Sequence, residues 1–148
     1  MKEIYTEIEI NAPAGVVWDI LTDFDHYPHW NPFILEISGD QVEGAQLDVF
    51  IKPPNSNGMR FKPKILSYKP EEELRWLGAL WIPKLFDGEH SLIIEKIDEN
   101  KVLFIQKEEF KGLLVSLVSG MLKDTESGFE AMNRALKREA EDEGILER

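Results

Sequence analysis

The stretch VSGMLKDTESGFEAMNRAL, residues 118–136, decides the fold of this chain. Five apolar residues and one threonine follow one another in it at intervals of four, three, four, three and four: Val118, Leu122, Thr125, Phe129, Met132 and Leu136. This spacing is typical of one face of an amphipathic helix. We expect the helix to run from Leu113 to Glu141, over about 40 Å, and its acidic tail, Glu139 to Arg148, to fray.

Upstream of this helix, most of the chain has the period of two that strands show. Residues Ile4 to Ile10 alternate between apolar and polar side chains, as a half-buried strand requires. Turn signals such as Gly39-Asp40 and Lys69-Pro70 then separate six further extended segments, at residues 33–38, 46–52, 59–68, 73–80, 87–97 and 101–111. A short amphipathic helix over Pro13–Thr22 and an aromatic connection with two prolines, 23–33, follow the first strand.

These elements predict a single α+β domain over residues 1–148. Short loops between neighbouring strands favour a seven-stranded antiparallel sheet. The sheet would wrap around the long C-terminal helix, with one short helical insertion after strand 1. One helix is only about 10 to 12 Å wide, which is too narrow to fill the concave face of a twisted sheet. We therefore expect a cavity between helix and sheet.

Composition narrows the possible partners and the compartment. The 148 residues carry a formal net charge of −11, so nucleic acid is not expected as a partner. There is no cysteine, which excludes disulfides and thiolate metal sites and fits a reducing compartment. The N-terminus shows no export signal, and the most apolar stretch is too short to span a membrane. We expect a cytoplasmic monomer that does not insert into membranes.

Several short motifs occur in an order and spacing that is fairly specific. They are Ala12-Pro13…Val17-Trp18, Thr22-Asp23-Phe24…Tyr27-Pro28…Trp30-Asn31-Pro32-Phe33, Leu74-Arg75-Trp76, Phe86-Asp87-Gly88-Glu89-His90-Ser91-Leu92 and Glu109-Phe110-Lys111-Gly112-Leu113-Leu114. With the order of elements, they resemble the START-like (SRPBCC) superfamily with the helix-grip fold, in its polyketide cyclase/dehydrase and lipid-transport branch. The resemblance covers nearly the whole chain. It implies a hydrophobic pocket between the long helix and the sheet.

The same resemblance leaves the activity open. Members bind lipids, sterols, plant hormones or polyketide intermediates, and only some of them are catalytic. No catalytic residue set runs through the superfamily, so none is carried over to this chain. The resemblance favours binding of a small hydrophobic molecule, and the rivals are an enzyme of the cyclase or dehydratase type and a protein-interaction module like the co-chaperone relatives.

Three polar residues are the candidates for polar contacts with a ligand in the pocket. Strand alternation places His90 on one face with Leu92, and Gln106 and Glu108 on one face with Phe104, all beneath the helix. Three interpretations remain open. The residues could form a hydrogen-bonded network within the core, contact a ligand, or transfer protons.

An aromatic and apolar set completes the predicted ligand site. Its further members are Trp30, Phe33, Phe61, Trp76, Trp81, Leu92, Phe104, Met121, Thr125 and Phe129. Large aromatic side chains of this kind line pockets for flat or acyl ligands, although core packing explains each of them equally well. The glycines Gly120 and Gly128 are unfavourable in a helix and indicate either a pocket or a close approach of helix and sheet.

Neither a metal nor a cofactor is expected. His26 and His29, with Asp23 and Asp25 nearby, could share a metal if they stood three apart on a helix. Pro28 lies between the two histidines and interrupts such a helix, and no third ligand is evident. A surface loop or a pocket rim is the preferred interpretation of this segment.

Overall fold

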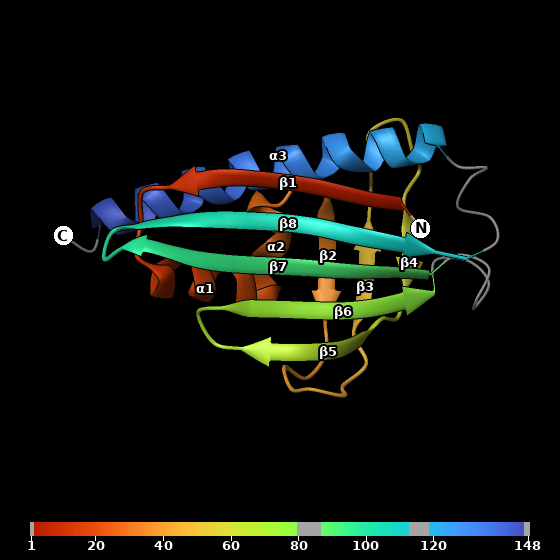
Figure 1. The fold of residues 1–148 in the computed structure, drawn as a ribbon, viewed down its shortest axis with the longest axis horizontal. Helices are drawn as coiled ribbons and strands as arrows, with labels where there is room; N and C mark the ends of the chain where they lie inside the picture. The colour runs from red at the N-terminus through yellow and green to blue at the C-terminus, as the bar shows by residue number, and fades with distance from the viewer. Residues whose placement is uncertain (1, 80–86, 113–118, 147–148) are drawn as a thin grey trace.

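A computed structural model describes residues 2–79, 87–112 and 119–146 (Figure 1). Its eight strands within these ranges form two antiparallel sheets, in the orders β1-β8-β7-β6-β5 and β2-β3-β4. The strands of the larger sheet are β1 Lys2–Ile10, β5 Lys64–Lys69, β6 Glu73–Ala79, β7 Asp87–Asp98 and β8 Lys101–Lys111. Those of the smaller sheet are β2 Ile34–Ser38, β3 Asp48–Ile51 and β4 Met59–Phe61. In Figure 1, the strands of the small sheet cross behind those of the large one.

The long helix α3, Ser119–Leu146, extends along β1 at one edge of the large sheet (Figure 1). The helices α1, Ala14–Thr22, and α2, Tyr27–Trp30, lie on the same side of that sheet as the small sheet. This arrangement confirms the predicted α+β class and the helix-grip fold. The element bounds also agree with the sequence patterns to within about two residues for most strands.

The prediction of one seven-stranded sheet is wrong in detail, because the segment 59–68 is two strands. Pro63 has no N–H to donate to a sheet ladder, so a strand breaks readily at this position. Its carbonyl instead accepts a hydrogen bond from the N–H of Leu47, and Gln46 pairs with Lys64 across an isolated bridge. The chain thereby leaves the small sheet at β4 and enters the large sheet at β5.

The buried face of α3 is the one that the spacing predicts. Leu122, Thr125, Phe129, Met132 and Leu136 are all buried, whereas Val118 and the predicted start at Leu113 lie outside the described residues. The predicted end at Glu141 is wrong, since the helix continues to Leu146.

A tether, formed by the side chain of Glu141, fixes the helix at its predicted end. The carboxylate of Glu141 accepts hydrogen bonds from the backbone N–H of Asn11, at 2.9 Å, and from Nζ of Lys137, at 2.6 Å. Ala140 beside it is fully buried. The helix is thus held against the start of the chain one turn beyond the last residue of the apolar stripe.

The aromatic connection forms two short helical turns, a 3₁₀ turn at Phe24–His26 and then α2. Pro28 lies in the first turn of α2, where its missing N–H has no intrahelical partner to lose. Tyr27 anchors the turns, because its hydroxyl donates to the carbonyl of Leu21 at 2.6 Å. Complete burial raises the pKa of this phenol. The connection thus leads the chain from α1 to β2 through packed aromatic contacts.

None of the helices in the described ranges has both the length and the apolar character that crossing a lipid bilayer requires.

Candidate functional site

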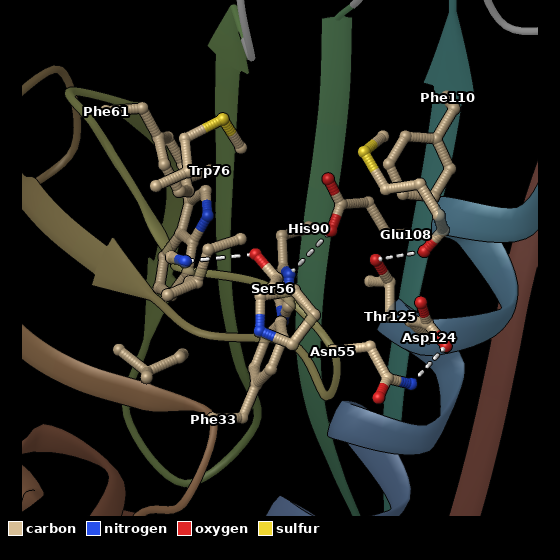
Figure 2. A pocket seen from close by; sticks show the side chains of 16 residues that line it. Phe33, Asn55, Ser56, Phe61, Trp76, His90, Glu108, Phe110, Asp124 and Thr125 are labelled. Atoms are coloured by element: carbon tan, nitrogen blue, oxygen red, sulfur yellow. Dashed lines mark hydrogen bonds and ion pairs between the residues drawn. The ribbon is translucent and has the colours of Figure 1, made fainter. Parts of the chain in front are cut away.

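A cavity of about 410 Å³ lies between the first two turns of α3, the large sheet and the small sheet (Figure 2). Apolar side chains form most of its wall, and a few polar ones converge in it. The lining residues are Phe33, Ile34, Ile51, Pro53, Asn55, Ser56, Gly58, Met59, Phe61, Trp76, His90, Glu108, Phe110, Met121, Asp124 and Thr125.

The small sheet and the loop between β3 and β4 supply one wall of the cavity. Ile51, Met59 and Phe61 come from the strands, and residues 53–58 come from the loop. Asn55 connects this wall to α3, since its Nδ2 donates to Oδ1 of Asp124 at 3.4 Å (Figure 2). Gly58 has φ +95°, and a Cβ there would lie 2.4 Å from the ring of Phe50, so only glycine fits this end of the loop.

The opposite wall is set by the register of three neighbouring strands. Trp76 on β6 pairs with His90 on β7, and His90 pairs with Glu108 on β8. Directly opposed residues point to the same face of a sheet, so the three side chains form a row across the concave face. The rings of Trp76 and His90 stack with centroids 5.0 Å apart, and the ring of Phe129 meets His90 edge-on at 4.9 Å.

His90 uses both of its ring nitrogens within this wall. Nδ1 lies 3.0 Å from Oε1 of Glu108, and Nε2 lies 3.0 Å from Oε1 of Gln106. His90, Gln106 and Glu108 are all buried. The predicted meeting of His90 with Glu108 and Gln106 beneath the helix is therefore present. The network continues from Gln106 to Asn133 on α3 and to Thr6 on β1.

The residues predicted from sequence divide into three groups. Seven of them line the cavity: Phe33, Phe61, Trp76, His90, Glu108, Met121 and Thr125. Five lie outside its lining: Trp30, Leu92, Phe104, Gln106 and Phe129. Leu92, Phe104 and Phe129 are fully buried core residues. Gln106 lies behind His90, and Trp30 packs edge-on against Tyr27, with ring centroids 5.2 Å apart. Trp81 lies outside the described residues.

Sequence reasoning missed nine of the sixteen lining residues, among them four residues of the loop and the acidic residue of the helix. Pro53, Asn55, Ser56 and Gly58 carry only a turn signal, which indicates a loop but not where the loop packs. Asp124 could have been found, because it follows the predicted site residue Met121 by three positions and therefore lies on the same side of the helix.

The two helix glycines have different surroundings. A Cβ on Gly128 would lie 2.4 Å from the ring of Phe33, so the close approach of α3 to this ring requires glycine. A Cβ on Gly120 would meet nothing within 4 Å. The expected close approach therefore explains Gly128 and not Gly120.

The histidines of the aromatic connection lie apart from the cavity. Nδ1 of the exposed His26 ring lies 2.7 Å from a carboxylate oxygen of Asp23. The hydrogen bond to Asp23, and next the charge of that carboxylate, raise the pKa of His26. The rings of His26 and His29 have centroids 5.7 Å apart. In the part of the chain that the structure describes, no group of three His, Cys, Asp or Glu side chains could hold a metal ion.

The sheets, the covering helix and the cavity between them define a protein of the START-like, helix-grip class. The chain belongs to the polyketide cyclase / dehydrase and lipid transport family, whose model matches residues 1–141. No curated protein sequence matches it.

Similar solved structures support the fold. The Zhui aromatase/cyclase from Streptomyces sp. R1128 superimposes with a TM-score of 0.73 at 14% identity, over 95% of this chain and 93% of that one. A START superfamily protein from Mycobacterium smegmatis gives a TM-score of 0.72 at 18% identity, over 95% of this chain and 97% of that one. The di-domain aromatase/cyclase BexL, from the BE-7585A biosynthetic pathway, gives a TM-score of 0.75 at 12% identity. The match covers 95% of this chain but spans only about half of BexL, 47%.

Proposed function

We propose that this protein binds a small hydrophobic molecule in the cavity, with the polar end of the molecule at Glu108. The observation that carries the proposal is a largely apolar cavity of about 410 Å³ with one buried carboxyl at its wall. Ligand sites are typically cavities of roughly 300 to 1,000 Å³ in which a few polar groups fix the orientation of the ligand. The family, which includes lipid transport in its description, fits this function.

Within this proposal, Glu108 and His90 have different roles. Both ring nitrogens of His90 already have protein partners, so they are not free for a ligand. Glu108 uses Oε1 for His90 and lines the cavity. His90 therefore orients Glu108, which contacts the ligand, and Trp76, Phe61 and Met121 surround the apolar part.

Binding is tested by titration of a solvatochromic dye, fatty acids and flavonoids into the folded protein. We expect saturable binding of at least one of these probes. The cavity-filling variant Thr125→Phe should abolish it, because Thr125 lines the cavity, whereas Glu130→Phe, on the exposed face of α3, should not. If no probe binds, the proposal fails. Native mass spectrometry of protein purified from its own host would identify a co-purified ligand.

A second candidate function is catalysis of the cyclase or dehydratase type. The observation in its favour is the buried His90–Glu108 pair at the cavity wall, since such a pair can accept and return a proton. The similar aromatase/cyclase structures also favour it. Chromatography coupled to mass spectrometry, with a substrate that contains 1,3-diketone units, would separate a cyclised isomer and detect loss of water. Glu108→Gln should abolish the conversion. A protein-interaction role is favoured by a collapsed cavity, which is not what the described residues form.

A further inference from the structure

The polar network behind the cavity has a fixed hydrogen-bond direction, which starts at a backbone carbonyl. The hydroxyl of Thr6 donates to the carbonyl oxygen of Gln106 at 2.7 Å, and a carbonyl can only accept. A hydroxyl has one hydrogen, so Oγ1 of Thr6 must accept from Nδ2 of Asn133, at 2.9 Å. The amide oxygen of Asn133 then faces Nε2 of Gln106, which donates to it at 2.8 Å.

This direction determines where His90 carries its proton. Because the side-chain nitrogen of Gln106 faces Asn133, its oxygen faces His90, and Nε2 of the imidazole must donate to it. The contact between Nδ1 of His90 and Oε1 of Glu108 then requires one more proton. That proton lies either on the ring, giving an imidazolium and a carboxylate, or on Oε1, giving a neutral ring and a carboxylic acid. In both arrangements Oε2 of Glu108 is a hydrogen-bond acceptor.

Oε2 of Glu108 is available to a ligand. Glu108 is 7% exposed and lines the cavity, and no group in the described part of the chain donates to its Oε2. The His90–Glu108 pair is neutral overall in both arrangements, and the side chain of Asp124 adds a carboxylate to the lining. Among the described lining residues there is no lysine or arginine to pair with an anion. The electrostatics of the cavity thus oppose a negative ligand and favour a donor.

We propose that the natural occupant is an apolar molecule with a hydroxyl or ammonium head, which donates to Oε2 of Glu108, and that carboxylate-headed molecules such as fatty acids are excluded. This inference rests on the proposed binding function. A carboxylate in the cavity would leave the acceptor on Glu108 without a donor and would be buried near the carboxylate of Asp124, and both effects are unfavourable. Thr6, Asn133 and Gln106 are positioning residues, which fix the direction of the hydrogen bonds to the His90 ring behind Glu108.

The experiment uses four probes that share one ring system: 2-naphthol, 2-naphthylmethylamine, naphthalene and 2-naphthoate. Calorimetric titration of the whole chain at neutral pH gives each dissociation constant. We expect the naphthol and the amine to bind about tenfold or more tighter than naphthalene, which corresponds to one good hydrogen bond, and the naphthoate to bind most weakly. Glu108→Met should remove the advantage of both donors. The amide of Glu108→Gln can keep an acceptor oxygen towards the cavity. This variant should therefore retain the tighter binding of naphthol but not that of the amine.

The outcomes separate the inference from the function on which it rests. Binding of naphthoate as tightly as naphthol would overturn the inference and leave the binding function intact. Failure of all four probes to bind to folded protein would overturn both.

The proton position is tested without any ligand, by the ¹⁵N shifts of the His90 ring. We expect Nε2 to be protonated in the wild type. Thr6→Val removes the hydroxyl donor that fixes the direction of the hydrogen-bond network, and should allow the tautomer with the proton on Nδ1. Thr6→Ser keeps the hydroxyl and should behave as the wild type. A merely structural role of Thr6 would not change the tautomer. A wild-type ring without a proton on Nε2 would overturn the argument, even if the valine variant does not fold.

Discussion

The two halves of α3 differ in what they cover. The closed half, residues 128–142, packs against other elements through Phe129, Met132 and Leu136, which have no exposed surface. The open half, residues 119–127, presents Met121, Asp124 and Thr125 to the cavity. One helix therefore has a packed end and a hollow end, although both belong to the same amphipathic stripe.

Stability and ligand binding therefore depend largely on different parts of the helix. Burial of a large apolar side chain stabilises the fold by roughly 1.5 to 3 kcal/mol, and the closed half contributes most of this on α3. A side chain that faces a cavity has fewer neighbours and contributes less. We therefore expect changes in the apolar side chains of the closed half to affect unfolding and changes at the cavity-lining residues of the open half to affect ligand binding.

The largest effect is expected from Phe129→Ala. The ring is fully buried and meets both Phe33 and His90 edge-on, so its removal should cost about 3 to 5 kcal/mol in the free energy of unfolding. Met121→Ala, in the open half, should cost less than about 1.5 kcal/mol because Met121 is half-buried at the cavity. Chemical denaturation measures both. A loss below about 1 kcal/mol for Phe129→Ala would remove the distinction between the halves.

A smaller effect is expected from His90→Phe, and it should appear in binding. The variant leaves Oε1 of Glu108 without its partner, and the binding of 2-naphthol should weaken by about 1 to 3 kcal/mol as a result. Naphthalene, which has no polar head, should lose less binding affinity. Calorimetry on the folded variant compares the two probes. Equal losses for both would reduce His90 to a packing residue of the cavity wall.

The glycines of α3 should respond in opposite directions to alanine. Gly128→Ala, in the closed half, forces its Cβ against the ring of Phe33, and the strain should outweigh the better helix propensity of alanine by about 1 kcal/mol. Gly120→Ala, in the open half, meets no neighbour and should stabilise by up to about 1 kcal/mol. Thermal unfolding of both variants measures the difference. Stabilisation by Gly128→Ala would contradict the close contact.

The smallest effect is expected from the tether at Glu141. Burial alone would raise the pKa of this carboxyl, but hydrogen bonds from Lys137 and the N–H of Asn11 outweigh it and lower the pKa. The contact therefore stabilises the fold at neutral pH, and this contribution is lost as the pH falls through the lowered pKa.

Glu141→Gln removes the charge while keeping the shape. It should cost less than about 1 kcal/mol at pH 7, because the pair is partly exposed. The difference from the wild type should vanish in acid. Denaturation across a series of pH values from neutral into acid tests this, and a difference that does not shrink as the pH falls would show that the carboxylate charge is not the cause.

Most of the fold could be predicted from the sequence, because hydrophobic periodicity reflects which face of each element is buried. The spacing from Leu122 to Leu136 identifies the covered face of α3 without any knowledge of its partners. The division of the sheet could not be predicted in this way. Pro63 interrupts one extended segment, and only its own contact with Leu47 and the pairing of Lys64 with Gln46 decide that the chain changes sheets there.

The site could be predicted where neighbouring strands determine it. The hairpin of β7 and β8 places His90 opposite Glu108, and alternation places both on the concave face. Alternation also places Leu92 and Phe104 on that face, but it does not say how far along the helix the cavity extends, and these two lie in the packed core. Thr6 and Asn133, which are far apart in sequence, meet only through the fold.

The contact of Gly128 with Phe33 has a consequence for how this architecture can diversify. An aromatic ring seated against a residue without a side chain holds the helix at one axial position and one rotation. Substitutions one or two turns earlier, at Met121, Asp124 or Thr125, can then reshape the cavity while the helix keeps its place. With the helix held by this contact, evolution or a protein engineer could change the ligand preference by altering few residues, at little cost in the stability of the folded state.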